Sequence, residues 1–147
     1  MVLFLDTNIL IDFFDRRETS ADAEAIFSFC SEDENQGIIA SLSVSILFYV
    51  LRKKLSVNQR KEHIRSLVEL FQVGSIDRDV VSAALDLDMK DFEDAMQAVC
   101  AQRNRAEWII SNNGKDFLNS PVPVISSSEF VKKYCASLKT HDAIKEP

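Results

Sequence analysis

The stretch Val2-Leu3-Phe4-Leu5-Asp6-Thr7-Asn8-Ile9-Leu10 decides the fold class of this chain. Four apolar residues run directly into Asp6, and apolar residues at helical spacing begin at Ile9. This pattern predicts a buried strand over 2–5 that is followed at once by a helix over 7–15. In open parallel α/β sheets, ligands bind outside the carboxyl ends of the strands. Asp6 therefore occupies a position where a functional site is expected.

Short apolar runs alternate with helical patterns along the rest of the chain. Further strands are expected over 38–42, 72–76, 107–111 and 123–125. Further helices are expected over 21–30, 43–54, 56–71, 77–87, 91–104 and 127–138. Ser43 is the expected cap of the helix over 43–54, and Asp77 that of the helix ending at 87. Ser127 or Ser128 is expected to cap the last helix, which ends at about 138. This order predicts a three-layer α/β/α sandwich with a mainly parallel sheet of four or five strands. Right-handed crossovers would place Asp6 and the turn over 111–113 on the same edge of that sheet.

Length and charge limit the classes of protein that fit. The 147 residues suffice for one domain, which we expect over 1–138, with a polar tail over 139–147. The three cysteines lack the number and spacing of a disulfide framework or zinc site. The net charge of -6 argues against a nonspecific nucleic-acid binder. The locally basic segment 52–65 is either a solvated helix face or a ridge that contacts phosphates.

The N-terminal segment lacks a basic lead-in, and its apolar run is too short for a secretory signal. The uncharged run over 36–51 contains Gly37 and several serines, so it fits a strand, a turn and a helix better than a membrane span. The chain is therefore expected in the cytoplasm, without a membrane partner.

Two further groups of polar residues could join Asp6. Asp91, Glu93 and Asp94 begin a helix, where acids also favour the helix dipole without any further role. Asn113 and Asp116 follow the strand over 107–111, where they could equally form a simple turn. Asp6 or Thr7 could likewise be no more than a helix cap.

Carboxylates from distant segments repel one another when a fold brings them together. A hard divalent cation such as Mg²⁺ or Mn²⁺ compensates that repulsion, because it prefers carboxylate and water oxygens. Such a metal lowers the pKa of bound water and stabilises charge on a phosphoryl group.

The whole pattern resembles the PIN-domain family of metal-dependent ribonucleases, which includes the toxin halves of VapBC-type toxin-antitoxin pairs. The resemblance rests on three segments, which are LDTNILID over 5–12, DAMQA over 94–98 and ISNNGKDF over 110–117. It runs from Met1 to about Phe130, and the three segments in this order and at these spacings are specific together. It implies hydrolysis of an RNA phosphodiester by metal-activated water, with Mg²⁺ or Mn²⁺ as the metal.

The resemblance also assigns roles residue by residue. Asp6, Asp94 and Asp116 are the expected catalytic acids, with Asn113 as a further metal ligand, and either Asn113 or Asp116 could be the residue of its segment that serves the metal. Thr7 and Asn8 resemble the residues that hold the loop of the first acid.

One position departs from the family pattern. The helix after the second strand usually carries a glutamate, and segment 41–53 matches that helix with Ile46 at the expected position. Isoleucine cannot bind a metal. Either Glu93 or Asp91 substitutes for the missing acid, or metal affinity is weak, or the chain binds without cutting. Ser43 and Ser45 could still hold a water of the metal.

Three hypotheses follow. The leading one is a metal-dependent endoribonuclease, a toxin whose partners are RNA, a small antitoxin protein and a second copy of the chain. The alternative is a degenerate PIN-like domain that binds RNA or a protein partner without catalysis. The third is a phosphoacceptor or a haloacid-dehalogenase-like phosphohydrolase with Asp6 as nucleophile, which would require a second aspartate at Asn8 or further acids before Asp6.

Overall fold

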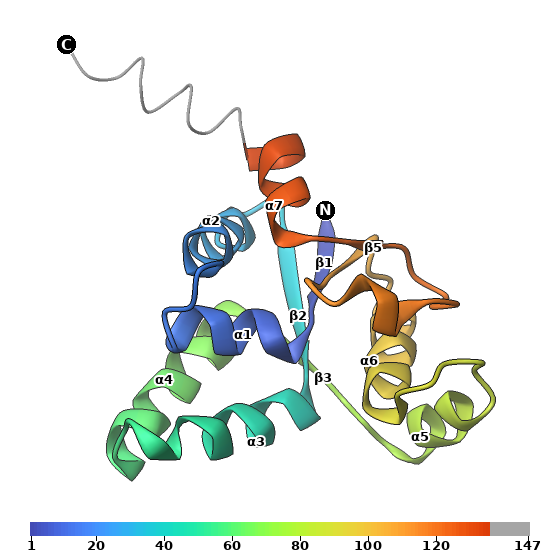
Figure 1. The fold of residues 1–147 in the computed structure, drawn as a ribbon, viewed down its shortest axis with the longest axis horizontal. Coiled ribbons are helices and arrows are strands. Elements are labelled where there is room, and N and C mark those ends of the chain that lie inside the picture. The colour runs from blue at the N-terminus through green and yellow to red at the C-terminus, as the bar shows by residue number, and fades with distance from the viewer. Residues whose placement is uncertain (136–147) are drawn as a thin grey trace.

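The computed structural model describes residues 1–135 (Figure 1). The expected tail over 139–147 and the last residues of the expected domain lie outside this range, so these boundaries remain predictions. No helix within the described range is long and apolar enough to cross a membrane.

Five parallel strands form the central sheet in the order β3-β2-β1-β4-β5. They are β1 (Val2–Leu5), β2 (Gln36–Ala40), β3 (Gln72–Gly74), β4 (Trp108–Ile110) and β5 (Val124–Ile125). β2 and β3 follow one another on one side of β1, and β4 and β5 then lie on its other side. The carboxyl ends of β1 and β4 therefore flank the topological switch point, where such sheets bind ligands.

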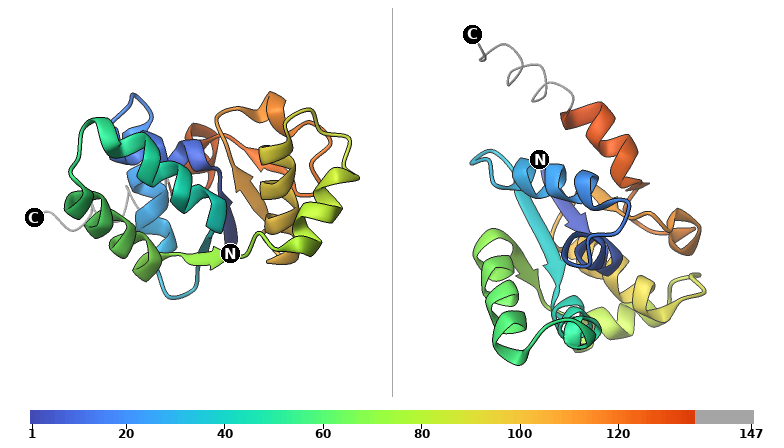
Figure 2. Two further views of the ribbon diagram at one scale, coloured as in Figure 1. Left: turned by 90° about the horizontal axis from the view of Figure 1, so that it is seen from below. Right: turned by 60° about the vertical axis from the view of Figure 1, so that its left-hand side comes forward.

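Helices cover both faces of this sheet (Figure 2). They are α1 (Thr7–Phe14), α2 (Ser20–Cys30), α3 (Ser41–Val50), α4 (Val57–Leu70), α5 (Arg78–Leu85), α6 (Phe92–Arg103) and α7 (Ser127–Phe130), with shorter turns at η1 (Leu51–Lys53), η2 (Gly114–Phe117) and η3 (Val131–Cys135). Figure 1 shows α1 to α4 on one side of the strands, and α5 and α6 on the other.

The central strands β1, β2 and β4 are buried on both faces, as a three-layer architecture requires, whereas Gln72 and Val73 of the edge strand β3 are exposed. Leu3 and Leu5 of β1 pack into the cluster that includes α1 and α2, whereas Phe4 points into the cluster that includes α6. Successive strand residues point to opposite faces, so a continuous apolar run fits only a strand covered on both sides. The predicted parallel α/β/α fold is confirmed.

Two expected helix starts are wrong. β2 ends at Ala40 and α3 begins at Ser41, so Ser43 is not a cap but a buried residue inside α3. The last helix is capped by Ser126, whose hydroxyl accepts from the N–H of Glu129 at 3.2 Å, and not by Ser127 or Ser128. The Ser43 hydroxyl instead contacts Thr7, and α3 follows Ala40 without a side-chain cap. The serines over 126–128 offer three similar capping signals, of which Ser126 is the one used.

Candidate active site

Asp6 stands at the carboxyl end of β1 and at the N-terminus of α1. Its backbone N–H donates to the carbonyl of Ile110 in β4 at 3.0 Å, which joins the two strands at the switch point. The carboxyl group is only 2% exposed and makes no capping hydrogen bond to α1. Instead, Asp6 accepts from the Ser111 hydroxyl at 2.9 Å and from the Gln97 amide at 3.2 Å. Asp6 therefore occupies the N-cap position of α1, but tertiary partners hold its side chain.

Gln97 connects Asp6 to the second acid. Its amide nitrogen donates to Asp6 and, at 3.4 Å, to Oδ1 of Asp94. Its amide oxygen accepts from the backbone N–H of Thr7 at 3.2 Å and from the Thr7 hydroxyl at 3.3 Å. Acceptors on one side of the amide and donors on the other fix its orientation. One fully buried side chain therefore brings the carboxylates of the N-terminal and central segments into a single network.

Thr7 and Ser43 extend this network into α3. Their hydroxyl oxygens lie 2.6 Å apart, and both side chains are buried. Because the Thr7 hydroxyl donates to Gln97, the hydrogen of Ser43 is the one that points toward Thr7. The structure therefore gives Ser43 a place beside the acids. Asn8 follows on α1 and is half-buried.

Asp94 lies in the first turn of α6, which is capped by the Asp91 side chain at 3.0 Å from the N–H of Asp94. Burial and the charges of Asp6, Asp91, Asp116 and Glu93 raise the pKa of Asp94 to about 7. Its carboxyl group is therefore only partly ionised at neutral pH. The helix dipole favours the ionised acid here, but burial and the surrounding negative charge outweigh it.

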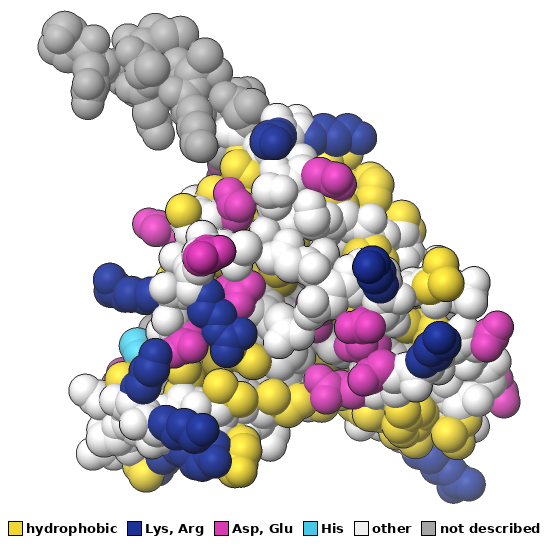
Figure 3. Space-filling view, viewed as in Figure 1, with side chains coloured by type: hydrophobic (Ala, Val, Ile, Leu, Met, Phe, Trp, Pro, Cys, Tyr) yellow, Lys and Arg dark blue, Asp and Glu magenta, His cyan; other side chains and the backbone are white. Residues whose placement is uncertain are grey.

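The pKa values of Asp6 and Glu93 are also raised, in both cases chiefly by burial. Burial raises the pKa of Asp6, although the hydrogen bonds from Ser111 and Gln97 act in the opposite direction. Burial, followed by the charges of Asp91 and Asp6, raises the pKa of Glu93. In Figure 3, acidic side chains gather beside α6 on the face that carries the site. A positive charge at this place would relieve all three shifts.

The loop after β4 supplies the third group. The Ser111 hydroxyl also accepts from the N–H of Asn113 at 3.1 Å, and the Asn113 carbonyl accepts from the N–H of Asp116 at 2.9 Å. Asn112 anchors the loop to α7, because its side-chain oxygen accepts from the N–H of Ser127 at 2.9 Å. Asn113 and Asp116 themselves are exposed. Asp116 lies near enough to affect the pKa of Asp94.

The donor groups of this network determine whether a divalent metal fits. Within residues 1–135, no three His, Cys, Asp or Glu side chains form a cluster that could hold a metal by themselves. Asp6 and Asp94 nevertheless share one amide donor, and the charge of Asp6 helps to raise the pKa of Asp94. Mg²⁺ is commonly held by one or two carboxylates together with water and substrate phosphates, so this pair fits it.

Ile46 lies three residues after Ser43 in α3, so the two side chains share one face of the helix. An apolar side chain therefore follows Ser43 where the family pattern has an acid. Gln97 and Ser111, by contrast, are polar residues of this network that the sequence analysis left without a role. The spacing of Gln97 from Asp94, three residues along one helix, is the signal that could have identified it.

Comparison with known proteins identifies the family. A sequence model described as PIN domain matches residues 2–115. The chain belongs to the PIN-domain family. One curated member, Ribonuclease VapC1 from Aquifex aeolicus (strain VF5), is 24% identical over 139 residues, which cover 90% of this chain and 94% of that protein.

Solved structures share the fold of this PIN domain. VapBC2 from Rickettsia felis, bound to a DNA fragment from its promoter, matches with a TM-score of 0.68 and 17% identity over 86% of this chain and 98% of that chain. A toxin-antitoxin complex from Klebsiella pneumoniae matches with a TM-score of 0.65 and 25% identity over 86% of this chain and 98% of that chain.

Proposed function

We propose that this chain is a divalent-metal-dependent endoribonuclease that acts as the toxin of a toxin-antitoxin pair. The proposal is carried by the Asp6–Gln97–Asp94 network at the switch point of a PIN fold. Family membership supports it, and the curated relative is named a ribonuclease.

Asp6 and Asp94 would hold Mg²⁺ or Mn²⁺, with Asp116 or Asn113 at the open side of the site. When bound, such an ion lowers the pKa of a water molecule and stabilises negative charge on a phosphoryl group. Gln97 and Ser111 orient the Asp6 carboxylate, and Thr7 fixes the amide of Gln97. Glu93 lies close enough to the acids to act on the same ion through its charge.

Cleavage of a short RNA in the presence and absence of Mn²⁺ tests this function. We expect cleavage with metal, loss with a chelator, and loss in Asp6→Asn and Asp94→Asn proteins that keep the wild-type circular dichroism spectrum. Glu107→Gln removes a carboxylate that bonds the N–H of Val2 away from the site, and serves as the matched control. Cleavage without metal, or full activity in both aspartate variants, would contradict the proposal.

The second candidate function is RNA or protein binding without catalysis, and Ile46 is the observation that favours it. Calorimetry with Mn²⁺ separates the two candidates. Heat of binding that disappears in Asp6→Asn supports the nuclease. A folded wild-type protein that shows no heat at millimolar metal supports the binding module.

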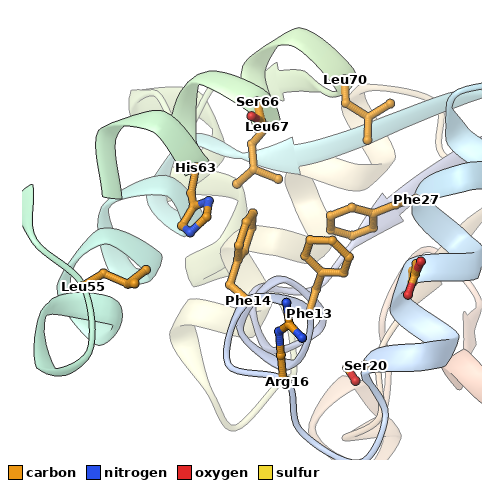
Figure 4. Close-up of a pocket in the computed structure, with 11 residues that line it drawn as sticks. Phe13, Phe14, Arg16, Ser20, Phe27, Leu55, His63, Ser66, Leu67 and Leu70 are labelled. Atoms are coloured by element: carbon orange, nitrogen blue, oxygen red, sulfur yellow. The ribbon is translucent and has the colours of Figure 1, made fainter. Parts of the chain in front are cut away.

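A groove of about 740 Å³ on the α1, α2 and α4 side is the surface we assign to the antitoxin (Figure 4). Phe13 and Phe27 stack at 4.2 Å between ring centres, and Phe14 faces His63 at 4.8 Å. These rings offer an apolar channel of the kind that an amphipathic helix fills. The similar solved structures include toxin-antitoxin complexes, which supports an antitoxin as the occupant.

Co-purification with the protein encoded next to this chain's gene tests the groove. Phe14→Asp is expected to abolish the complex, since it places a charge among the rings. Leu85→Asp changes an exposed apolar residue of α5 and should leave the complex intact. An unchanged complex in Phe14→Asp would exclude this groove. The cytoplasmic location and the homodimer remain predictions, and sedimentation equilibrium measures the second.

A further inference from the structure

Segment 52–65 carries a concentration of positive charge on an acidic protein. Six of the 17 Lys and Arg residues lie in these positions, with Glu62 as the single acid, although the whole chain has a net charge of -6. The segment spans η1 and most of α4. Such a concentration produces a local positive potential despite the negative total.

Several of these cations have no carboxylate partner. Lys54 pairs with Asp15 at 2.5 Å, and Arg65 pairs with Glu62 at 3.3 Å. In the part of the chain that the structure describes, no ion pair involves Arg52, Lys53, Arg60 or Lys61. These four residues are called the basic patch below. Within residues 1–135, the charges of these four side chains are therefore not compensated by an ion pair and are available to a ligand.

Two aromatic rings hold the guanidinium groups of the basic patch. Arg52 lies over the ring of Tyr49 at 3.6 Å and donates to the Tyr49 carbonyl at 2.8 Å. Arg60 lies over the ring of Phe48 at 4.3 Å and donates to the Phe48 carbonyl at 2.9 Å. Arginine has five N–H donors, so most donors of each group remain free. Tyr49 is 62% exposed, which leaves an aromatic surface accessible beside fixed cations.

The basic patch lies at the far end of the helix that touches the active site. Ser43 of α3 contacts Thr7 in the network of acids, and Tyr49 follows six residues later on the same helix. Six residues of α-helix rise about 9 Å. Figure 3 shows the acids beside α6, basic side chains over the turn between α3 and α4, and apolar side chains over α3 between them.

A groove of about 520 Å³ between α3 and α4 adjoins the basic patch. Phe48 and Ile64 line it together with Lys61 and Arg65. Apolar walls and cations around one opening suit a nucleobase joined to a phosphate.

We propose that the basic patch and Tyr49 bind a single-stranded part of the RNA substrate beside the cleavage site. This inference rests on the proposed nuclease function and adds to it the state of the RNA and the surface that holds it. Arg52, Lys53 and Lys61 contact phosphates, and a base stacks on Tyr49.

The exposed ring favours a single strand over a duplex. Bases in a duplex are stacked on one another and offer no free face, whereas bases of a single strand stack on aromatic side chains. The unpaired cations favour a phosphate backbone over a protein partner, because phosphates supply charge at every nucleotide. The acids at the site repel phosphates, so an attractive surface nearby is needed to hold the strand.

Fluorescence anisotropy with a labelled unstructured oligoribonucleotide tests the proposal, in EDTA so that no cleavage occurs. The logarithm of the binding constant falls linearly with the logarithm of the salt concentration. For a single strand, each phosphate contact that is lost reduces the magnitude of this slope by about 0.7. Arg52→Gln/Lys53→Gln should therefore lower that slope by about 1.4. Tyr49→Ala should weaken binding by about fivefold or more, and Tyr49→Phe should restore it.

Arg78→Gln/Lys132→Gln removes the same charge from exposed positions outside the patch and should keep the wild-type slope. A wild-type slope in Arg52→Gln/Lys53→Gln, wild-type affinity in Tyr49→Ala, or tighter binding of a fully paired hairpin would each overturn the proposal. Patch-dependent binding without any cleavage would refute the nuclease function alone. Asp94-dependent cleavage with unaltered binding in the patch variants would refute this inference alone.

Discussion

At the scale of single residues, the raised pKa of Asp94 makes the stability of the fold depend on pH. Its pKa rises from 3.8 to about 7 through burial and neighbouring carboxylates. Below pH 3.8 the group is protonated in both the folded and the unfolded chain, so it costs no stability there. As the pH rises toward about 7, the unfolded chain ionises first, and the free energy of unfolding falls.

The first prediction concerns Asp94→Asn. This variant should have a higher free energy of unfolding than the wild type at pH 8 without metal, and the two should differ little at pH 3.5, because only ionised Asp94 is penalised. Urea unfolding at both pH values measures the difference. A constant difference across this range would show that the effect of the substitution is unrelated to ionisation.

Gln97 is the second residue with a distinct expectation. Gln97→Leu leaves the buried N–H and hydroxyl of Thr7 without their acceptor and removes the shared donor of Asp6 and Asp94. Such losses cost about 1–3 kcal/mol of unfolding free energy. Gln102→Leu alters an exposed glutamine of the same helix and should change stability by about 0.5 kcal/mol or less. Equal unfolding midpoints for the two variants would mean that the hydrogen bonds of Gln97 do not contribute to the free energy of unfolding.

Ile46 offers a test by gain of affinity. Ile46→Glu places a carboxylate about one helical turn beyond Ser43, on the face of α3 that contacts Thr7 of the network. Outer partners of a metal site already change affinity by about 10–100-fold, so a direct ligand should tighten Mn²⁺ binding by about tenfold or more. Ser45→Glu adds the same charge at an exposed neighbouring position and is the control. Calorimetric titration in which both variants match the wild type would place residue 46 away from the ion.

At the scale of elements, β2 packs closely at Gly37 against Phe71, which follows α4, and against Cys30 at the end of α2. A Cβ on Gly37 would lie 2.4 Å from the ring of Phe71 and 2.9 Å from the sulfur of Cys30. Gly37→Ala should therefore lower stability by about 1–3 kcal/mol, the usual cost of overpacking. Gly114→Ala meets no atom within 4 Å and should change stability by about 0.5 kcal/mol or less. Thermal unfolding of the two variants gives the comparison.

The elements also show which features could be predicted from the sequence. The apolar run 2–5 and its neighbours predict buried parallel strands, because only residues covered on both faces can all be apolar. Caps at Asp77 and Asp91 follow from local chemistry and are confirmed, with N–H contacts at 2.9 and 3.0 Å. The start of α3 was placed wrongly, because strand pairing through Ala40 ends β2 before Ser43.

The candidate site likewise contains residues that the sequence identifies and residues that it does not. Asp6 and Asp94 are identifiable because each marks the end of a strand or the start of a helix. The bridging role of Gln97 depends on Asp6 and Thr7, which lie 91 and 90 positions away in the sequence, so the local sequence around Gln97 does not reveal it. Long-range hydrogen bonds of this kind follow from the fold and not from a local pattern.

At the scale of the whole molecule, the two charge clusters occupy separate elements. Acids gather where α6 meets the ends of β1 and β4, and unpaired cations gather at η1 and α4. Phosphates are attracted to the second region and repelled from the first. A divalent ion between the acids would remove this conflict, because it would let a strand bound at the basic patch reach the site.

The metal should therefore stabilise the entire fold. An ion that binds only the folded chain adds about 2.7 kcal/mol to the free energy of unfolding when its free concentration is a hundred times its Kd. For a domain of this size, each kcal/mol raises Tm by about 2–4 °C. We expect Mn²⁺ to raise the Tm of the wild type by about 5–10 °C and to leave Asp6→Asn unchanged at the same ionic strength. An equal rise in both proteins would place the stabilising ions elsewhere on the acidic surface, whereas a rise confined to the wild type would locate the ion at the Asp6 carboxylate.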